Sequence, residues 1–414
     1  MKAAIIGGGI IGLSSAYYLQ KRGWDVTVMD RSDLVDNCSY GNLGMIVPSH
    51  FVPLAAPGMV AQGIRWMFDN KSPFYVKPVL DMDLISWGWK FLKSASAKNV
   101  EKAAIPLLQL NQYSKELYEE LARQPGFDFG FERKGILMYY KSEKTQAEEV
   151  HLAGKARTMG LDVDVLTKDQ VMLLEPGTEL DILGAIHYKS DAHLYPNHLI
   201  QQLIHHLEKA GVRILRNCEL KNVIVKDGAV RKAITDKSDL DADVFVMANG
   251  SWLPATAKKL HIRIPLMPGK GYSFTDKHPE QKLNIPAILC EARVAITPMN
   301  GFMRYGGTME IGSINDNINL TRVEGIVQSI PGYFPGFRLT MPGKSEIWYG
   351  FRPVTPDGLP YLGYSRKLKN VIIAGGHAMM GLSLGPASGK IVADLASGEQ
   401  PGVDITAFRV DRFS

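Results

Sequence analysis

The chain has 414 residues, a formal net charge of +5 at pH 7, 45% hydrophobic residues and 21% charged residues. This length exceeds that of one ordinary hydrophobic core and predicts two domains, and the composition is typical of a soluble globular protein. The weak positive charge, without a long basic run, gives no support for nucleic-acid binding. No apolar stretch reaches the roughly 18 residues of a membrane-spanning helix, so we expect a cytoplasmic protein, with association at the inner face of a membrane left open.

Three cysteines, Cys38, Cys218 and Cys290, lie far apart in the sequence and lack metal-ligand spacing. A small, odd number of cysteines argues against a disulfide framework and is typical of a reducing compartment. We therefore predict no zinc or iron–sulfur site, and no metal ion. The apolar N-terminus has an alternative interpretation as a secretory signal peptide, but its glycines follow a stricter spacing.

The start of the chain predicts a strand, a helix and a second strand in succession. Lys2–Ile6 is a short apolar run typical of a buried parallel strand, and Asp25–Met29 predicts another. Between them a helical pattern runs from Ile10 to about Arg22, and Gly23 is placed to end it. This order predicts a βαβ unit with a ligand site at the carboxyl ends of its strands.

A glycine motif occupies the turn between the first strand and the helix. Gly7, Gly9 and Gly12 have the spacing G-x-G-x-x-G, which allows a tight turn, close approach of a pyrophosphate and close packing of helix on strand. The helix N-terminus offers N–H groups to phosphates. Asp30 follows the second strand, where a carboxylate can accept hydrogen bonds from ribose hydroxyls. The unit predicts a dinucleotide site without distinguishing FAD from NAD.

Further motifs continue along the chain. They are the segment from Asp36 to Pro48 (DNCSYGNLGMIVP), Ala55–Gly58, VFVMANGSW at 244–252, PGKGYS at 268–273, GGTME at 306–310, WYGFRPVTPDGLP at 348–360 and the glycine-rich stretch 375–389. In this order they resemble the D-amino-acid oxidase superfamily of FAD enzymes, and within it most of all the bacterial D-amino-acid dehydrogenases of the small-subunit type. Residues 348–360 are the strongest match, to the signature G-x-R-P-x-T-P-D-G-x-P.

The resemblance implies a fold and a reaction. The fold is α/β and glutathione-reductase-like, of the D-amino-acid oxidase type, in which a Rossmann-type FAD-binding domain is interleaved with a mixed-sheet α+β substrate domain. The reaction is oxidation of a D-amino acid, including proline or hydroxyproline isomers, with hydride transfer from the α-carbon to flavin N5. The product is an imino acid that hydrolyses to a 2-oxo acid. We expect FAD to be bound non-covalently, because no cysteine lies in the glycine-rich stretch.

We predict that the two domains alternate along the chain. The FAD-binding domain comprises residues 1–50, 192–260 and 346–414, and the substrate domain comprises residues 51–191 and 261–345. In the C-terminal piece, Asn370–Ala374 predicts a strand, and a helix follows from about Leu384 to Leu395. In the substrate domain, leucines on one face predict a helix from about Ala104 to Arg123, and short strand-like runs predict a mixed sheet.

Three residues are candidates for substrate binding and catalysis. Arg352 lies in the signature that resembles the family's carboxylate-binding segment, and its planar guanidinium suits a carboxylate; its alternative is an ion pair with Glu346 or Asp357. Tyr272 lies in the element that resembles the substrate side of the flavin site, where its hydroxyl would bond the carboxylate or amine; its alternative is a core aromatic. His50 occupies a position where the family places an aromatic residue or a histidine, and would polarise an amine or a water unless it is structural.

The same segments supply the predicted FAD-binding residues. These are Gly7, Gly9, Ile10, Ile11, Gly12, Asp30, Arg31, Ser39, Asn42, Leu43, Gly44, Asn249, Gly250, Gly376, His377, Met380, Gly381, Leu382 and Ser383. We expect His377 to serve the flavin, and the helix start near Leu382 and Ser383 to stabilise negative charge at the flavin N1–C2=O edge. No catalytic base is required, because binding the neutral amine in a dry, oriented site supplies most of the rate.

The segment 59–92 has two interpretations, which differ in the electron acceptor that they imply. This segment holds three of the six tryptophans, with lysines and an arginine interspersed. It is either a membrane-interface patch, which would suit electron transfer to a quinone, or a lid or helical hairpin packed on the substrate domain. Two alternatives to a dehydrogenase also remain: a glycine- or sarcosine-type amine oxidase that uses oxygen, and an FAD-carrying subunit of a larger dehydrogenase complex, for which the same segment would be the partner surface.

Overall fold

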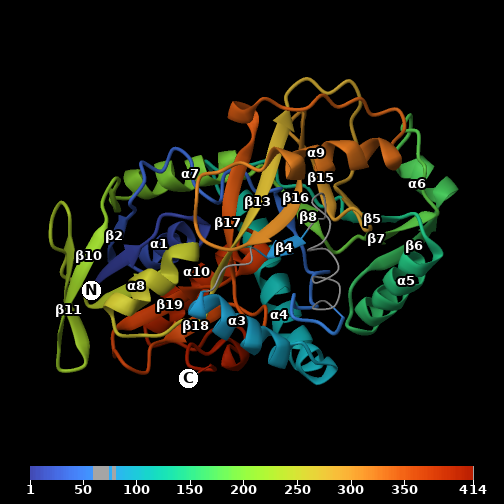
Figure 1. Ribbon diagram of the computed structural model, residues 1–414. Coiled ribbons are helices and arrows are strands. Elements are labelled where there is room, and N and C mark those ends of the chain that lie inside the picture. Colours follow the sequence, from blue (N-terminus) through green and yellow to red (C-terminus); the bar gives the residue numbers. More distant parts are fainter. Residues whose placement is uncertain (59–73, 77–80, 414) are drawn as a thin grey trace.

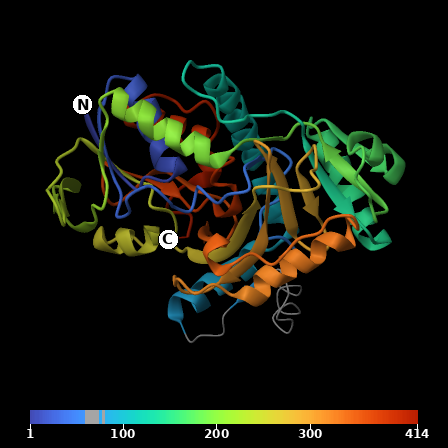
Figure 2. The ribbon, with the colours of Figure 1, turned by 90° about the horizontal axis from the view of Figure 1, so that it is seen from above.

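The computed structural model describes residues 1–58, 74–76 and 81–413, and its strands form two main sheets (Figure 1). The first has six strands in the order β18-β19-β12-β1-β2-β9. The second has nine, in the order β17-β13-β16-β15-β14-β5-β7-β6 with β4 paired to β16. Figure 2 shows the two sheets side by side, with α5 and α6 at the end farthest from the N-terminus.

The six-stranded sheet carries the predicted βαβ unit. Its strands are β1 (Lys2–Ile6), β2 (Asp25–Met29), β9 (Arg213–Leu215), β12 (Val244–Met247), β18 (Tyr361–Tyr364) and β19 (Val371–Gly375), and its helices are α1 (Ile10–Lys21), α7 (Pro196–Lys209), α8 (Leu253–Lys259) and α10 (Gly385–Ala396). β1 runs parallel to β2 and β12, and β12 runs parallel to β19, so the carboxyl ends of these strands meet at one edge. Helix α4 (Ala97–Ala122) packs against α10.

Alternation along β1 explains how both faces of this sheet are covered. Ala3 and Ile5 join the core that contains α1 and α10, whereas Ala4 and Ile6 join the core that contains α8. Successive side chains of a strand point to opposite faces, and parallel sheets with helices on both faces are apolar throughout. The predicted strand, helix and strand at the start of the chain are therefore confirmed.

The nine-stranded sheet is mixed, as predicted. Its strands are β4 (Phe74–Val76), β5 (Ile136–Tyr140), β6 (Val163–Thr167), β7 (Gly184–Tyr188), β13 (Met267–Asp276), β14 (Ala287–Leu289), β15 (Val294–Met299), β16 (Phe302–Ile311) and β17 (Trp348–Val354), with helices α3 (Met82–Ser94), α5 (Glu143–Thr158), α6 (Lys168–Leu174) and α9 (Leu320–Ser329). β13, β15, β16 and β17 pair antiparallel, whereas β5 and β14 pair parallel. Two small ribbons complete the fold: β3 (Met45–Ile46) with β8 (Ala192–His193), and β10 (Leu220–Lys226) with β11 (Ala229–Thr235).

Two predicted elements are longer than expected. Helix α4 begins at Ala97, not at 104, because the Ser96 side chain accepts a hydrogen bond from Asn99 N and caps the helix there; the helix continues through Pro106. Strand β16 has ten residues and is longer than the short runs predicted for the substrate domain, because its glycine pair, Gly306 and Gly307, still pairs with β13 and β15. Both extensions depend on contacts that hydrophobic periodicity does not encode.

The strands alternate between the two sheets along the chain, in the manner proposed for the domains, with one difference. β17 lies within the piece 346–414 assigned to FAD binding, yet it pairs with β13 over seven residues, from Met267↔Val354 to Ser273↔Trp348. This pairing joins the strand that carries the signature motif to the nine-stranded sheet. We propose that the C-terminal piece of the FAD-binding domain begins after β17, near residue 355.

Most of the segment 59–92 lies outside the described residues, namely 59–73 and 77–80. The described remainder is β4 and α3. Trp87 of α3 is buried and its indole N–H donates to the carbonyl of Val354 at 2.9 Å. Within the described residues, no helix is long and apolar enough to cross a membrane.

Candidate active site

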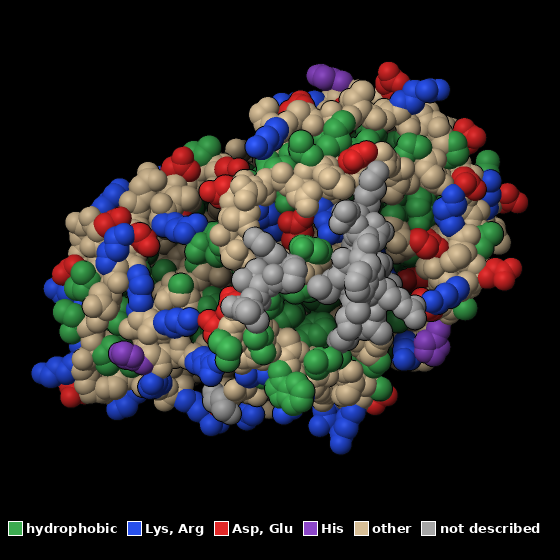
Figure 3. All heavy atoms as spheres, in the orientation of Figure 1, with side chains coloured by type: hydrophobic (Ala, Val, Ile, Leu, Met, Phe, Trp, Pro, Cys, Tyr) green, Lys and Arg blue, Asp and Glu red, His purple; other side chains and the backbone are tan. Residues whose placement is uncertain are grey.

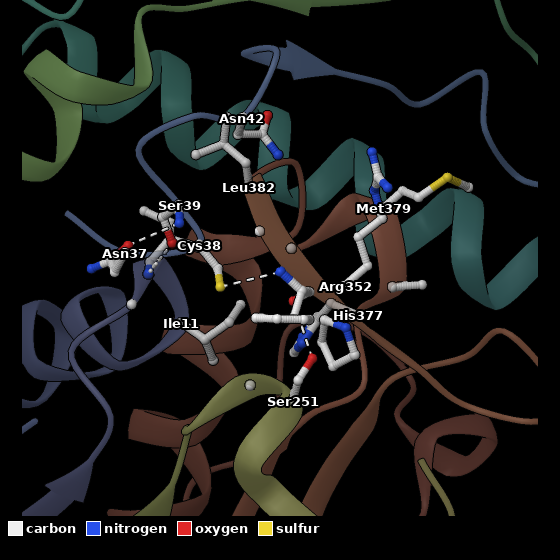
Figure 4. A pocket seen from close by; sticks show the side chains of 18 of the residues that line it. Ile11, Asn37, Cys38, Ser39, Asn42, Ser251, Arg352, His377, Met379 and Leu382 are labelled. Atoms are coloured by element: carbon white, nitrogen blue, oxygen red, sulfur yellow. Dashed lines mark hydrogen bonds between the residues drawn. The ribbon is translucent and has the colours of Figure 1, made fainter. Parts of the chain in front are cut away.

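The two main sheets contribute to a large shared cavity. It has a volume of about 670 Å³ and reaches from the turn between β1 and α1 to strands β13 and β17. Its walls include most of the predicted site residues: Gly7, Gly9, Ile10, Ile11, Asp30, Arg31, Ser39, Asn42, Leu43, His50, Asn249, Gly250, Tyr272, Arg352, His377, Met380, Gly381 and Leu382. Figure 4 shows Ile11, Cys38, Arg352 and His377 converging on this space from four separate segments.

Four predicted cofactor residues, Gly12, Gly44, Gly376 and Ser383, do not line the cavity. A Cβ at Gly12 would overlap the carbonyl oxygen of Gly7, and Gly44 and Gly376 have φ of +72° and +80°, so these glycines serve the backbone of the surrounding turns. Ser383 uses its hydroxyl within the protein, accepting from a backbone N–H at 3.0 Å and donating to an asparagine side chain at 2.8 Å. That these four residues help to bind the cofactor remains a prediction.

Asp30 lies at the nucleotide end of the cavity. Its Oδ2 accepts a hydrogen bond from Gly8 N at 2.7 Å, and its Oδ1 accepts from the backbone N–H and the hydroxyl of Ser32 at 2.8 and 2.7 Å. These bonds fix the carboxylate after β2, and Oδ2 keeps a lone pair for a ribose hydroxyl. Arg31 stacks on the ring of Trp252, with 4.0 Å between the guanidinium carbon and the ring centroid, and both residues line the cavity.

The loop between β2 and β3 forms the wall beside α1. The Ser39 hydroxyl accepts a hydrogen bond from Ile10 N at 3.1 Å and so satisfies one free N–H of the first helical turn. From the opposite side, Arg304 on β16 donates to the carbonyls of Tyr40 and Asn42 at 2.9 and 2.8 Å. Arg304 is buried, and the nine-stranded sheet thereby holds a loop of the nucleotide side in place.

Two buried polar side-chain atoms on the cavity wall have no hydrogen-bond partner within the described part of the chain. They are Oδ1 of Asn249, which follows β12, and Oγ1 of Thr308 on β16. Buried polar atoms are normally paired, so each indicates a partner that a bound molecule would supply. Thr308 also has φ of +60°, which is unusual for a β-branched residue and is typical of strained functional sites.

Arg352 enters the cavity from β17. Its Nη1 donates to the carbonyl of Thr308 at 2.6 Å, and its guanidinium lies so close to Gly271 that a Cβ there would overlap it. Burial lowers the pKa of Arg352 to about 10, so the group stays charged at pH 7. Gly271, in the segment PGKGYS, therefore makes room for a cation on the cavity wall.

The alternative ion pairs predicted for Arg352 do not form. Asp357 pairs instead with Arg412 at 2.6 Å, and Glu346 accepts from the backbone N–H of Gly343 at 2.7 Å. Among the residues that the structure describes, no carboxylate forms an ion pair with Arg352. Its positive charge is thus available to an anionic ligand.

Tyr272 lines the cavity, but its hydroxyl is already engaged. It donates to Glu310 Oε2 at 3.1 Å and accepts from Asn319 N at 3.2 Å. The side chain is 1% exposed, and burial raises the pKa of its phenol. The hydroxyl thus already has two partners within the protein, and its bond to the substrate remains a prediction. Tyr272 lines the cavity together with Arg352.

The two predicted histidines differ in their surroundings. His50 is partly exposed at the cavity, and burial together with the charge of Arg293 lowers its pKa to about 4, so its ring is neutral at pH 7. His377 is buried, its Nε2 lies 2.8 Å from the hydroxyl of Ser388 on α10, and burial lowers its pKa to about 3. His377 is thus anchored to α10, whereas His50 presents a neutral imidazole.

Cys38 and Arg293 are among the cavity residues that were not predicted. Cys38 lies within a motif already quoted, and its Sγ accepts from Phe351 N at 3.3 Å; burial raises the pKa of the thiol. Arg293, in the turn between β14 and β15, has φ of +53° and lines the cavity. No motif marks Arg293, because only the pairing of distant strands brings it to the site.

Sequence comparison places the chain in a known family. The family described as FAD dependent oxidoreductase (DAO) matches residues 2–395. The chain belongs to this family of FAD-dependent oxidoreductases. The resemblance to the D-amino-acid oxidase superfamily is thereby confirmed, and the flavoenzyme uses FAD as its cofactor.

Two relatives match this flavoenzyme over almost its whole length. It is 30% identical over 411 residues to the D-amino acid dehydrogenase of Helicobacter pylori, with 98% of each chain covered. It is 29% identical over 426 residues to the D-amino acid dehydrogenase of Bradyrhizobium diazoefficiens, with 100% of this chain and 99% of the relative covered.

Solved structures confirm the predicted fold. The glycine oxidase from Geobacillus kaustophilus superposes with a TM-score of 0.79 at 21% identity and covers 100% of this chain and 98% of its own. The L-proline dehydrogenase from P. horikoshii gives a TM-score of 0.76 at 18% identity, with 100% and 97% covered. The flavoenzyme therefore has the α/β fold expected for the D-amino-acid oxidase type.

The residues of the flavoenzyme fit FAD. The turn from Gly7 to Gly9 would hold the pyrophosphate, Asp30 the ribose, and the unpaired atoms of Asn249 and Thr308 would bond to polar groups of the cofactor or of a ligand beside it. When bound, FAD supplies the capacity to accept two electrons. Within the described residues, no group of three histidine, cysteine or acidic side chains could hold a metal ion.

Proposed function

We propose that this enzyme is a D-amino-acid dehydrogenase. The substrate loses a hydride from its α-carbon and a proton from its nitrogen, and the imino acid then hydrolyses to a 2-oxo acid and ammonia. One observation carries the proposal: Arg352 is charged and without a carboxylate partner among the described residues, on the wall of the cavity that begins at the nucleotide turn. The names of the two relatives support the D configuration.

The wall of the cavity supports a small apolar side chain on the substrate. Leu54, Met138, Ile288 and Met309 line it together with Arg352. Such a wall accommodates alanine-like substrates as well as the rings of proline and hydroxyproline isomers. The thiol of Cys38 lies on the wall but is held protonated by its raised pKa, which supports non-covalent FAD.

Anaerobic reduction tests this proposal. The purified holoenzyme is mixed with D- and L-amino acids, D-proline isomers, glycine and sarcosine, and the flavin absorbance is followed. We expect D-amino acids or D-proline isomers to bleach the flavin band. Bleaching by glycine or sarcosine alone would instead indicate an amine oxidase, and a flavin that no compound reduces until a second protein is added would indicate a subunit of a larger complex.

We also propose that the enzyme docks on the anionic inner face of a membrane and passes its electrons to a quinone. Helix α3 supports this proposal, because Met82, Ile85, Trp89 and Leu92 lie on one helical face and are 51–78% exposed. Figure 3 shows apolar side chains beside basic ones over the region where Figure 1 places α3. Among the basic residues, Lys93 lies over the ring of Trp89 at 5.0 Å. Such a combination suits anionic headgroups.

Binding to lipid vesicles tests whether the exposed apolar face of α3 docks on a membrane. We expect the holoenzyme to sediment with vesicles that contain anionic lipid and not with zwitterionic vesicles, and Trp89→Ser with Ile85→Ser to abolish binding. Lys144→Gln on the distant helix α5 is the control. Equal binding of the double variant, or rapid peroxide formation from oxygen without a quinone, would contradict this part of the proposal.

A further inference from the structure

Hydrogen bonds connect His50 to a fully buried carboxyl group that no motif identifies. Asp191 follows β7 and is 0% exposed. Its Oδ1 accepts from the backbone N–H of Ser49 at 2.9 Å, and its Oδ2 accepts from the Ser49 hydroxyl at 2.5 Å. The same hydroxyl lies 3.0 Å from Nδ1 of His50. The series Asp191–Ser49–His50 therefore ends on the cavity wall.

The number of protons along this series decides the state of the imidazole. A carboxylate is only an acceptor, so the single hydroxyl proton of Ser49 points to Asp191. The Ser49 oxygen can then only accept from Nδ1 of His50, which must carry the ring proton. His50 is neutral, so its Nε2 carries no proton, and no described residue forms a hydrogen bond with Nε2.

We propose that Asp191 and Ser49 are positioning residues that hold His50 in its Nδ1–H tautomer, so that Nε2 accepts a hydrogen bond from the amino group of the substrate. This inference rests on the proposed function, because the amino group belongs to the proposed substrate. The bond orients the neutral amine while Arg352 holds the carboxylate, so two groups fix the α-carbon between them. Asp191 itself touches no substrate.

The surroundings of the series set the pH above which this arrangement holds. Lys115 on α4 and the Ser49 donors act against the burial that raises the pKa of Asp191 to about 7, and Tyr188 on β7 is the neighbouring phenol. Arg293 faces His50 and opposes a charge on its ring. Above pH 7 Asp191 is a carboxylate and the Nδ1–H tautomer holds. Below pH 7 a protonated Asp191 can donate to Ser49, which reverses the series and places the proton on Nε2.

Nitrogen NMR of the ring tests the tautomer directly. The holoenzyme is deuterated and labelled with ¹⁵N-histidine, and His50→Gln assigns the signals. At pH 8 we expect Nδ1 of His50 to have the shift of a protonated nitrogen and Nε2 that of an unprotonated one. In Asp191→Asn the amide must donate to Ser49, so we expect the two shifts to exchange. A proton on Nε2 in the wild type, or the same tautomer in both proteins, would overturn the proposal.

A comparison of two ligands tests the link to the amino group. We expect Asp191→Asn and Ser49→Ala to lower kcat/KM for the best D-amino acid about 10- to 100-fold at pH 8, and Ser49→Thr to restore most of the loss. The Kd of propionate, a carboxylate without an amine, is read from the flavin spectrum and should stay within about twofold. Asp181→Asn, which removes an exposed carboxylate paired with Lys141 at 2.6 Å, is the charge control.

The outcomes separate this inference from the proposed function. If Asp191→Asn and Ser49→Ala lose propionate binding and activity equally, or leave kcat/KM unchanged, Asp191 and Ser49 are not positioning residues. Wild-type enzyme that no amino acid reduces would refute the proposed function, while the ring spectrum would still decide the tautomer. If Asp191→Asn fails to fold, Ser49→Ala carries the kinetic and propionate measurements, because it breaks the series and keeps the buried carboxyl, and the ring spectrum of the wild type at pH 8 decides the tautomer.

Discussion

Arg352 depends on its planar shape as much as on its charge. Its Nη1 is tied to the carbonyl of Thr308 at 2.6 Å, so the rest of the guanidinium is oriented before a ligand arrives. A lysine would keep a charge but lose the fork that binds both carboxylate oxygens. We expect Arg352→Gln to lower kcat/KM about 100-fold, or about 3 kcal/mol, and Arg352→Lys to lower it less. Steady-state kinetics with the best substrate measures this.

The control for Arg352 is FAD content. The substitution removes a ligand for the substrate but no group near Asp30, so the bound flavin per chain should not change. Arg338→Gln, an arginine outside the cavity walls, should leave both quantities unchanged. If Arg352→Gln turns over like the wild type, Arg352 is not the carboxylate ligand and the proposed function loses its main support.

Asp191 makes folding stability depend on pH. Its pKa is raised from 3.8 to about 7 in the folded protein, mainly by burial. Below about pH 4 the carboxyl group is protonated in both the folded and the unfolded protein, so it does not change the free energy of unfolding. Between pH 4 and 7 the unfolded chain ionises and the folded protein does not, so stability falls as pH rises. We expect Asp191→Asn to gain stability relative to the wild type between pH 5 and pH 8, measured by urea unfolding at each pH.

The residues of the site differ in how far the sequence predicts them. Arg352 and Asp30 lie in local motifs, so their place in the cavity follows from the pattern. Tyr272 lies in a motif too, yet its hydroxyl bonds with Glu310, and no spacing rule reveals which way a side chain points. Only the pairing of distant strands brings Arg293 to the cavity and Asp191 to Ser49, and the sequence does not encode that pairing locally.

Helices and strands also differ in whether a local pattern or the pairing of distant segments determines them. The first strand, helix and second strand were predicted closely, because each has its own apolar period and a glycine or acid at its end. The C-terminal strand and α10 were predicted within one or two residues. By contrast, the pairing of β17 with β13 was not predicted, because it joins strands that lie more than 70 residues apart in the chain.

The loop between β2 and β3 shows how one element positions another. Arg304 on β16 donates to two of the loop's carbonyls and to the side chain of Asn197 at 3.0 Å. We expect Arg304→Gln to leave buried acceptors unpaired and to lower the free energy of unfolding by about 2 to 3 kcal/mol. Because the loop forms the wall beside α1, FAD affinity should fall about tenfold, measured by flavin fluorescence.

A matched substitution separates the role of the loop from a loss of charge. Arg263→Gln removes an arginine that is exposed and bonds only weakly to Ser86, at 3.5 Å. It should change neither stability nor FAD affinity measurably. If Arg304→Gln lowers stability but not FAD affinity, the loop is not part of the cofactor site.

At the scale of the whole molecule, the two sheets cannot be separated by one cut in the chain. Strands of the six-stranded sheet come from the start, the middle and the end of the sequence, and strands of the nine-stranded sheet lie between them. The cavity takes its walls from both sheets. FAD that binds in this cavity would lie against both sheets, so its binding free energy should stabilise them together.

We therefore expect the holoenzyme to unfold in one cooperative transition. FAD at about 100 times its Kd adds about 2.7 kcal/mol to the stability of a folded state that alone binds it. Calorimetry at increasing FAD should show a single peak that moves to higher temperature as a whole. Two peaks, of which FAD shifts only one, would mean that the sheets unfold as independent domains and that the cofactor is held by the six-stranded sheet alone. A single peak would mean that the chain segments passing between the two sheets couple the nucleotide end of the cavity to Arg352. Loss of FAD should then also disorder the substrate end of the cavity.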